Sequence, residues 1–198
     1  MIDSGRIEAA VAELLDAIGE DPSRADLVGT PSRVADAYRE FFSGVGVDPQ
    51  EHLSDLMPVP PDHPAELVVL RASAFRSICE HHLLPFIGVA HLAYLPGERI
   101  VGLGRLPQVV DILAARPQLQ ERLGEEIASA LDDGLSPRGV LVVLDARHSC
   151  VTSRGGRQVD SSTVTIASRG ALSDPVQRAE AMGLITMASS SADAAVPA

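Results

Sequence analysis

Lysine is absent from the sequence, because all sixteen basic residues are arginine. Without a lysine amine, the chain cannot perform Schiff-base chemistry and has no phosphate-binding lysine of the Walker type. Cysteine is also scarce. The two cysteines, Cys79 and Cys150, are too few for a scaffold held together by disulfides. They therefore form a single bridge, remain two buried thiols, or bind a metal ion.

Long apolar runs and excess positive charge are missing as well. The longest apolar stretches, such as residues 140–144, are far shorter than the roughly 20 residues of a membrane span, and the first residues lack a secretory signal pattern. We therefore expect a soluble cytoplasmic protein with no membrane partner. The net charge of −11 argues against a nucleic-acid partner, because phosphate backbones require clustered cations.

The negative charge is concentrated in the first third of the chain. Residues 1–66 hold four basic and fourteen acidic residues, whereas residues 67–198 hold twelve and thirteen. A site for an anionic ligand is therefore expected in the second part. The length fits one domain with an appended segment. We expect a helical segment and linker over 1–65, a main domain over 66–187 and a disordered tail over 188–198.

Apolar periodicity predicts an α+β fold. A first helix is expected to begin at Asp3 or Ser4, and a second begins with Thr30 as a capping residue and ends near Gly44. Residues 45–65 are rich in proline and indicate a connector. Beyond it, the pattern predicts strands at 66–77 and 86–95, two helices broken at 116–117, strands at 140–148 and 162–168, and a helix at about 175–187. The resulting order ββααββ is that of two hairpins around a helix pair.

Two cysteine–histidine clusters lie at predicted strand ends. If both hairpins share one sheet, Cys79, His82 and Cys150 converge as a Cys2His set of zinc ligands. Three protein ligands leave the fourth tetrahedral position for water, which zinc can activate as a nucleophile. His81 and His148 remain beside this site as proton donors or acceptors. Spacing alone leaves open that the thiols are simply buried and that the histidines are unrelated.

Three segments of the chain, in order, closely resemble the zinc-dependent GTP cyclohydrolase I family. They are SICEHHLLPFIGVAHLAYLP, RPQLQERLGEEIASAL and DARHSCVTSRGGR, within a similarity that runs from about Thr30 to Glu180. The resemblance implies a tunnelling fold (T-fold) for residues 66–187, in which four-stranded antiparallel sheets of several subunits join into a barrel. It also implies a homodecamer with active sites between subunits.

The family's site residues can be carried over to this chain. Its zinc ligands fall on Cys79, His82 and Cys150, the same three residues that ligand counting selects. Its purine-recognising pair falls on Gln120 and Glu121, where a carboxylate accepts hydrogen bonds from the guanine. The implied reaction opens the imidazole ring of a guanine nucleotide at C8, releases formate and gives dihydroneopterin triphosphate.

The resemblance also assigns the proton-transfer and phosphate-binding residues. It implies that His81 moves protons at the imidazole nitrogens and that His148 protonates the ribose ring oxygen. The cations expected to bind the triphosphate are Arg105 and Arg154, with Arg33 as a further candidate. Both histidines would otherwise be interpreted as ordinary core or capping residues.

The chain departs from the family at one position expected near the ribose and at two expected near the phosphates. Gly104 replaces a serine, Gln108 replaces an arginine, and Asp36 replaces a lysine that is frequent in the family. Charge-assisted hydrogen bonds of this kind contribute roughly 1.5 to 3 kcal/mol each. We therefore expect weaker selection for a triphosphate than the family shows. Glu80 either orients a ligand or ends its strand in solvent.

Three alternatives to ordinary GTP cyclohydrolase activity follow. One is a divergent paralogue that acts on a modified or less phosphorylated guanine nucleotide. Another is a non-catalytic protein that uses zinc only to hold a subunit interface. The third is a tunnelling-fold relative with thiol-nucleophile reductase chemistry, for which the sequence offers no evident nicotinamide site.

Overall fold

The computed structural model describes residues 2–60, 62, 66–154 and 158–187. The tail expected to be disordered, 188–198, lies outside the described residues. The helices are α1 (Ser4–Ala17), α2 (Thr30–Phe41), α3 (Arg105–Ala114), α4 (Gln120–Leu135), α5 (Ser149–Thr152) and α6 (Pro175–Thr186), with short 3-10 turns η1 (Pro49–His52) and η2 (Ala171–Ser173). The strands are β1 (Leu56–Pro58), β2 (Val68–Cys79), β3 (Pro85–Leu95), β4 (Arg99–Val101), β5 (Pro117–Gln118), β6 (Gly139–His148) and β7 (Thr163–Gly170).

The expected four-stranded antiparallel sheet is present and has one addition. Strands β2, β3, β6 and β7 pair in that order, each antiparallel to its neighbour. The short strand β5 adds to the outer edge of β2 in parallel, and places Gln118 opposite Cys79. A two-residue strand arises from this tertiary pairing, so the sequence pattern offers no sign of it.

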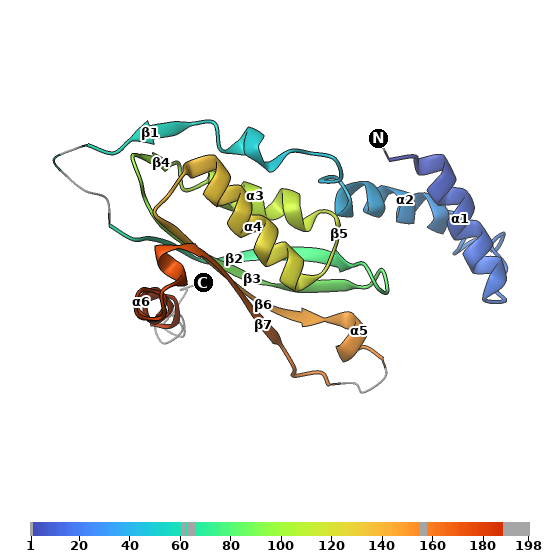
Figure 1. The fold of residues 1–198 in the computed structure, drawn as a ribbon. Coiled ribbons are helices and arrows are strands. Elements are labelled where there is room, and N and C mark those ends of the chain that lie inside the picture. The colour runs from blue at the N-terminus through green and yellow to red at the C-terminus, as the bar shows by residue number, and fades with distance from the viewer. Residues whose placement is uncertain (1, 61, 63–65, 155–157, 188–198) are drawn as a thin grey trace, which may run out of the picture.

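Helices α3 and α4 cover one face of the sheet, while α6 lies against the other (Figure 1). The main core fills the space between the sheet and the two helices, with Phe86, Leu106, Leu131 and Leu144 fully buried. Strand β6 is buried on both sides for most of its length, which explains its unbroken run of valine and leucine. This interior strand ends at His148, two residues before the predicted metal ligand Cys150.

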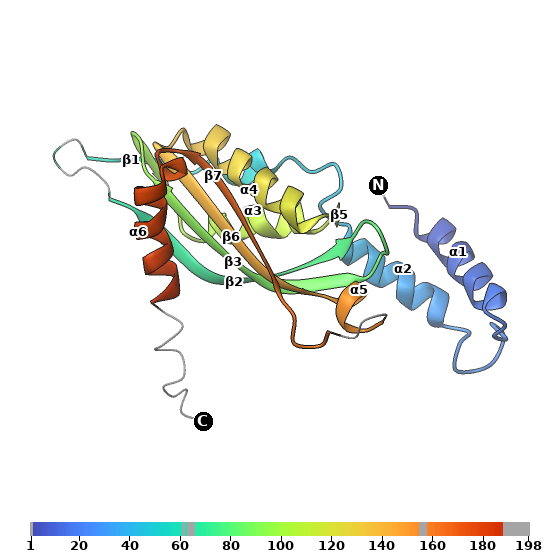
Figure 2. The ribbon, with the colours of Figure 1, turned by 60° about the horizontal axis from the view of Figure 1, so that its bottom comes forward.

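The N-terminal helices α1 and α2 pack against each other and project beyond the sheet (Figures 1 and 2). Asp3 caps α1 as expected, by accepting a hydrogen bond from the main-chain amide of Arg6. The expected cap of α2 was wrong. Gly29 precedes the helix, and Thr30 is its first residue, with a hydroxyl that accepts a hydrogen bond from Arg33 instead of closing the helix end.

The described part of the connector expected over 45–65 is more ordered than its proline content indicated. It contains η1 and also β1, which pairs with β4. Leu53 is buried in the core, and the Gln50 side chain donates a hydrogen bond to the Ala130 carbonyl of α4. Tertiary contacts of this kind order the segment, and local sequence propensity does not predict them.

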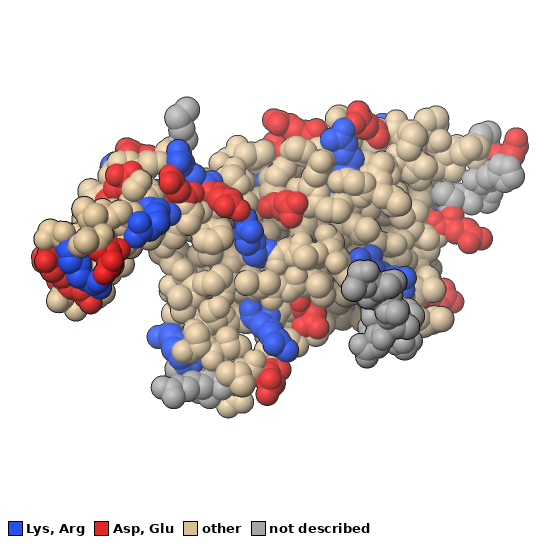
Figure 3. All heavy atoms as spheres, turned by 180° about the vertical axis from the view of Figure 1, so that it is seen from behind, with Lys and Arg blue, Asp and Glu red and all other residues tan. Residues whose placement is uncertain are grey.

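Charge is unevenly distributed over the surface. Seen from behind, side chains of both signs crowd the projecting helices, while much of the body on this face is uncharged (Figure 3). Among the described residues, no helix has the length and apolar character required to cross a membrane.

Candidate metal centre and active site

Cys79, His82 and Cys150 come together at one end of the sheet. Their ligand atoms all lie within 4.8 Å of one another, and Cys79 Sγ is 4.0 Å from His82 Nδ1. Cys79 ends β2, His82 lies in the turn that follows, and Cys150 lies in α5, directly after β6. Both cysteines are free thiols, so the disulfide alternative is excluded.

The turn between β2 and β3 presents the first two of these residues. The Cys79 amide donates to the Leu84 carbonyl at 2.9 Å, and the Leu83 amide donates back to the Cys79 carbonyl at 2.8 Å. Leu83 adopts a left-handed conformation, with φ of 51°. The β3–β6 register then sets Phe86 opposite His148, which brings the chain that carries Cys150 beside this turn.

This donor set fits a zinc ion. Zinc bonds of about 2.0–2.3 Å in tetrahedral geometry require ligand atoms roughly 3.5–3.8 Å apart, which small side-chain rotations can supply here. Burial, followed by the nearby Cys79 thiol, raises the pKa of Cys150. A bound cation would therefore displace a proton from this thiol, as cysteine metal sites commonly do.

His148 is held in place on two sides. Its ring stacks on Phe86 with centroids 4.7 Å apart and planes within 5°. Its Nε2 atom lies 2.7 Å from Oε1 of Gln120. Burial lowers the pKa of His148, and the carboxylate of Glu121 opposes that shift. His81 is exposed, and its ring meets that of His82 edge-on, with centroids 6.1 Å apart.

Gln120 is almost completely buried, and its side-chain amide is fully engaged within the protein. Its Nε2 atom donates to the carbonyls of Leu144 and Thr163, at 3.0 and 2.8 Å, and lies 3.2 Å from the Thr165 hydroxyl. Carbonyl oxygens can only accept hydrogen bonds, so the amide oxygen must face His148. The His148 ring therefore carries its proton on Nε2 when neutral. No local pattern of residues indicated this contact.

Glu121 lies beside Gln120 in the first turn of α4 and is exposed. Its carboxylate is close enough to His148 to affect the pKa of that ring. The structure therefore brings the predicted purine-recognising carboxylate and the predicted proton donor to the same end of the sheet as the metal ligands. A carboxylate at this position can accept hydrogen bonds from two adjacent N–H groups of a base.

The three predicted phosphate-binding arginines do not lie together in a single chain. Arg154 acts on the Cys150 thiol, where its charge opposes the rise in pKa caused by burial. Arg105 begins α3 and pairs with Asp55. The other end of this ten-residue helix, roughly 15 Å away, is the one fastened to β2 near the metal ligands. Arg33 lies on the projecting helix α2.

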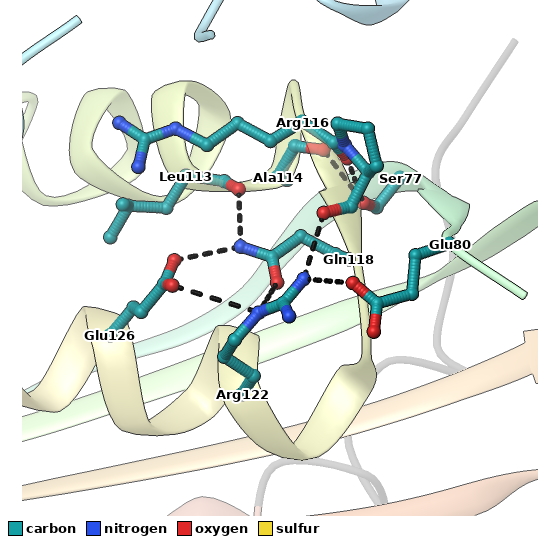
Figure 4. A network of polar contacts seen from close by, with 9 residues as sticks. Ser77, Glu80, Leu113, Ala114, Arg116, Gln118, Arg122 and Glu126 are labelled. Atoms are coloured by element: carbon teal, nitrogen blue, oxygen red, sulfur yellow. Dashed lines mark hydrogen bonds and ion pairs between the residues drawn. The ribbon is translucent and has the colours of Figure 1, made fainter. Parts of the chain in front are cut away.

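A further polar network, which was not predicted from the sequence, links the metal-binding turn to α4. Arg122 forms an ion pair with Glu80, donates a hydrogen bond from Nε to Gln118, and forms a second ion pair with Glu126 (Figure 4). The i, i+4 spacing from Gln118 to Arg122 to Glu126 was a visible signal. The partner Glu80 was not, because it lies 42 residues away in sequence.

Comparison with known proteins shows the family of this chain. Residues 7–186 match the GTP cyclohydrolase I family. A protein of Leifsonia xyli subsp. xyli named GTP cyclohydrolase 1 is 61% identical over 92% of this chain and 95% of its own length. Proteins of the same name from Rhodopirellula baltica and Clostridioides difficile are each 50% identical, over 96% and 94% of this chain and 82% and 98% of their own lengths.

A solved structure, the archaeosine synthase QueF-Like in the apo form, covers 55% of this chain and 97% of its own at 17% identity, with a TM-score of 0.44. That likeness is too distant to bear on function. The family match runs through the segment that carries every candidate ligand, and the relatives are similar along nearly their whole lengths, so this chain belongs to the GTP cyclohydrolase I family.

Proposed function

We propose that this protein is a GTP cyclohydrolase I, with residues 66–187 as its catalytic domain. It hydrolyses the imidazole ring of GTP at C8 and releases that carbon as formate, to give dihydroneopterin triphosphate. The observation that carries the proposal is the convergence of Cys79, His82 and Cys150 beside His148 and Glu121. The high identity to proteins named GTP cyclohydrolase 1 supports it.

The metal in this proposal is zinc, held by Cys79, His82 and Cys150. Two thiolates and one imidazole suit zinc better than they suit magnesium or calcium, which prefer oxygen ligands. These three residues would hold the ion and leave its fourth coordination position for water, which zinc when bound would activate as a nucleophile. The two free cysteines also suit a reducing compartment, which supports a cytoplasmic location.

The side chains around this centre bind the base and move protons. Glu121 accepts hydrogen bonds from N1–H and the 2-amino group of guanine. His81 transfers protons at the purine imidazole nitrogens as the ring opens. His148 keeps its Nε2 proton in the hydrogen bond to Gln120, so it passes a proton to the ribose ring oxygen from Nδ1 of the doubly protonated ring, a form that the Glu121 carboxylate favours. General acid–base steps of this kind typically contribute about 10² to 10⁴ in rate.

The remaining phosphate-binding residues support an assembly. Arg154 is close enough to Cys150 to affect the pKa of its thiol, whereas Arg33 lies on the projecting helix α2 and Arg105 pairs with Asp55. We propose that a neighbouring subunit supplies them, in the homodecamer that the family resemblance implies. The sheet has edges suited to such joining, since β7 is an outer strand and β5 pairs with β2 only at Ile78 and Cys79.

A guanine compound panel tests this function. Zinc-loaded protein is incubated with GTP, GDP, GMP and guanosine, and formate and pterin are quantified by mass. We expect formate in equal amount to the GTP consumed. Zinc binding without formate from any compound would overturn the proposal in favour of a silent zinc protein. Faster turnover of GMP or guanosine would replace GTP with a less phosphorylated substrate.

A further inference from the structure

We infer that Glu80 and Arg122 form a positioning pair that sets the distance between the metal ligands and the base-binding carboxylate. The inference rests on the proposed function and adds residues to which the resemblance assigned no role. Glu80 lies between the ligand Cys79 and the proton-transfer residue His81. Arg122 directly follows Glu121. The ion pair therefore joins the metal-binding turn to the base-binding end of α4, through residues that directly neighbour Cys79 and Glu121.

Contacts other than the ion pair with Glu80 fix the orientation of the Arg122 side chain. Its Nε atom donates to Oε1 of Gln118 at 3.0 Å, and its Nη2 atom donates to the Pro117 carbonyl at 2.9 Å. Gln118 is fully buried and is itself held, because its Nε2 atom donates to Glu126 at 2.8 Å and to the Leu113 carbonyl at 3.0 Å (Figure 4). A guanidinium fixed through several donors gives its partner a defined position.

The main chain next to the ion pair is fastened in the same direction. The Glu80 amide donates to the Gln118 carbonyl at 3.0 Å, and Cys79 is paired with Gln118 in the β2–β5 register. Two residues before Cys79, in the same strand, the Ser77 hydroxyl donates to the Ala114 carbonyl at 2.7 Å. The end of β2 is thus held to the segment between α3 and α4, and the Glu80–Arg122 pair extends this attachment into the metal-binding turn.

The proposed reaction is sensitive to this distance. The base is bound from α4, through Glu121, while the nucleophile is generated at ligands on the β2–β3 turn and α5. Reacting atoms must approach to about 3–3.5 Å, and a misplacement of about 1 Å can reduce the rate about 100-fold. A partly exposed ion pair contributes little to the free energy of unfolding. We therefore expect the Glu80–Arg122 pair to act by aligning the metal ligands with the base-binding carboxylate. The Glu80 and Arg122 side chains are 30% and 41% exposed.

The variants Glu80→Gln, Arg122→Gln and Arg122→Lys test the inference, with Glu125→Gln as the matched control. Glu125 lies on α4, as Arg122 does, and pairs at 2.7 Å with Arg169 of β7. Its ion pair therefore links α4 to β7 and not to the metal-binding turn. We expect kcat to fall about 10- to 100-fold in the Glu80 and Arg122 variants, while KM and zinc content stay close to wild type. The double variant Glu80→Gln/Arg122→Gln should be no slower than either single change, because both remove the same link.

Two measurements separate positioning from other roles. The visible spectrum of the Co2+-loaded protein should shift in Glu80→Gln and Arg122→Gln but not in Glu125→Gln, because the turn carries two of the ligands. GTP binding to the metal-free protein, measured by calorimetry, should be unchanged in all of them. A rise in KM with unchanged kcat would overturn the inference in favour of substrate contact, and activities and spectra equal to the control would overturn it outright.

The lysine variant guards against failure to fold, since it retains the charge and loses only the fork of donors. If wild-type protein released no formate, the proposed function would fail, and the cobalt spectra would still decide whether the pair positions the turn. An unshifted spectrum in Glu80→Gln would then reject the positioning role.

Discussion

His148 donates a hydrogen bond from Nε2 to Oε1 of Gln120, at 2.7 Å, while the amide nitrogen of Gln120 is occupied by main-chain carbonyls. From this arrangement we expect Gln120 to orient His148, a role that differs from the purine recognition assigned by the family resemblance. The change Gln120→Leu is therefore expected to lower kcat about 10- to 100-fold and to change KM for GTP much less. Steady-state kinetics, with thermal unfolding measured in parallel, checks this. A large increase in KM at unchanged kcat would instead assign the side chain to the base.

The neighbouring histidines His81 and His82 offer a matched comparison. His82 supplies a ligand atom of the Cys2His set, whereas His81 is proposed to move protons. His82→Ala should lose zinc and activity together. His81→Ala should retain zinc and lower kcat by about 10² to 10⁴. Zinc content by atomic absorption and kcat are measured on the same samples, and loss of zinc from His81→Ala would show that the roles are wrongly divided.

The substitutions at the expected nucleotide-binding positions predict weak binding of the GTP triphosphate. The charge of Arg105 is already shared with Asp55, and Asp36 pairs with Arg39 where a lysine is frequent in the family. The double change Gly104→Ser/Gln108→Arg should raise kcat/KM for GTP about tenfold or more, because it restores a hydroxyl and a cation. Turnover of guanosine serves as the control and should rise much less, since guanosine offers its ribose to the restored hydroxyl but no phosphate to the restored cation. An equal increase for both compounds would contradict the prediction.

His91 gives the fold a dependence on pH that is separate from the metal site. Its Nδ1 atom accepts a hydrogen bond from the Ala72 amide at 3.3 Å, where β2 has a register shift and Ala72 adopts φ of 54°. Burial lowers the pKa of His91 from 6.5, Asp145 opposes the shift, and Arg71 adds to it. The unfolded chain therefore binds more protons between the lowered pKa and 6.5, so stability falls as pH falls through this window.

The variant His91→Asn tests this contribution, because it offers an oxygen to the Ala72 amide but does not titrate. Denaturant unfolding of both proteins between about pH 7 and about pH 5 should show a smaller loss of stability in the variant. Parallel curves would contradict a titrating role for His91.

Much of the fold followed from local patterns in the sequence. The apolar run that became β6 and the break between α3 and α4 at Pro117 were both visible, and the clusters around Cys79 and Cys150 were placed correctly at strand ends. What local patterns could not supply was pairing across long separations. Strand β5 and the partnership of Glu80 with Arg122 exist only because β2 and α4 meet in space.

The site shows the same division. Ligand counting found the Cys2His set because its members are rare residue types with distinctive spacing. The engagement of Gln120 was hidden, because its partners His148, Leu144 and Thr163 come from two strands of the sheet. Polar satisfaction inside a core depends on the assembled elements, and a single sequence does not reveal it.

The most direct test of the account is to measure zinc content and formate release together in wild-type protein and in the variant Cys150→Ala. The account predicts about one zinc per chain and formate equal to the GTP consumed in the wild type, with both lost in the variant. Undiminished formate release from a variant that holds no zinc would contradict it.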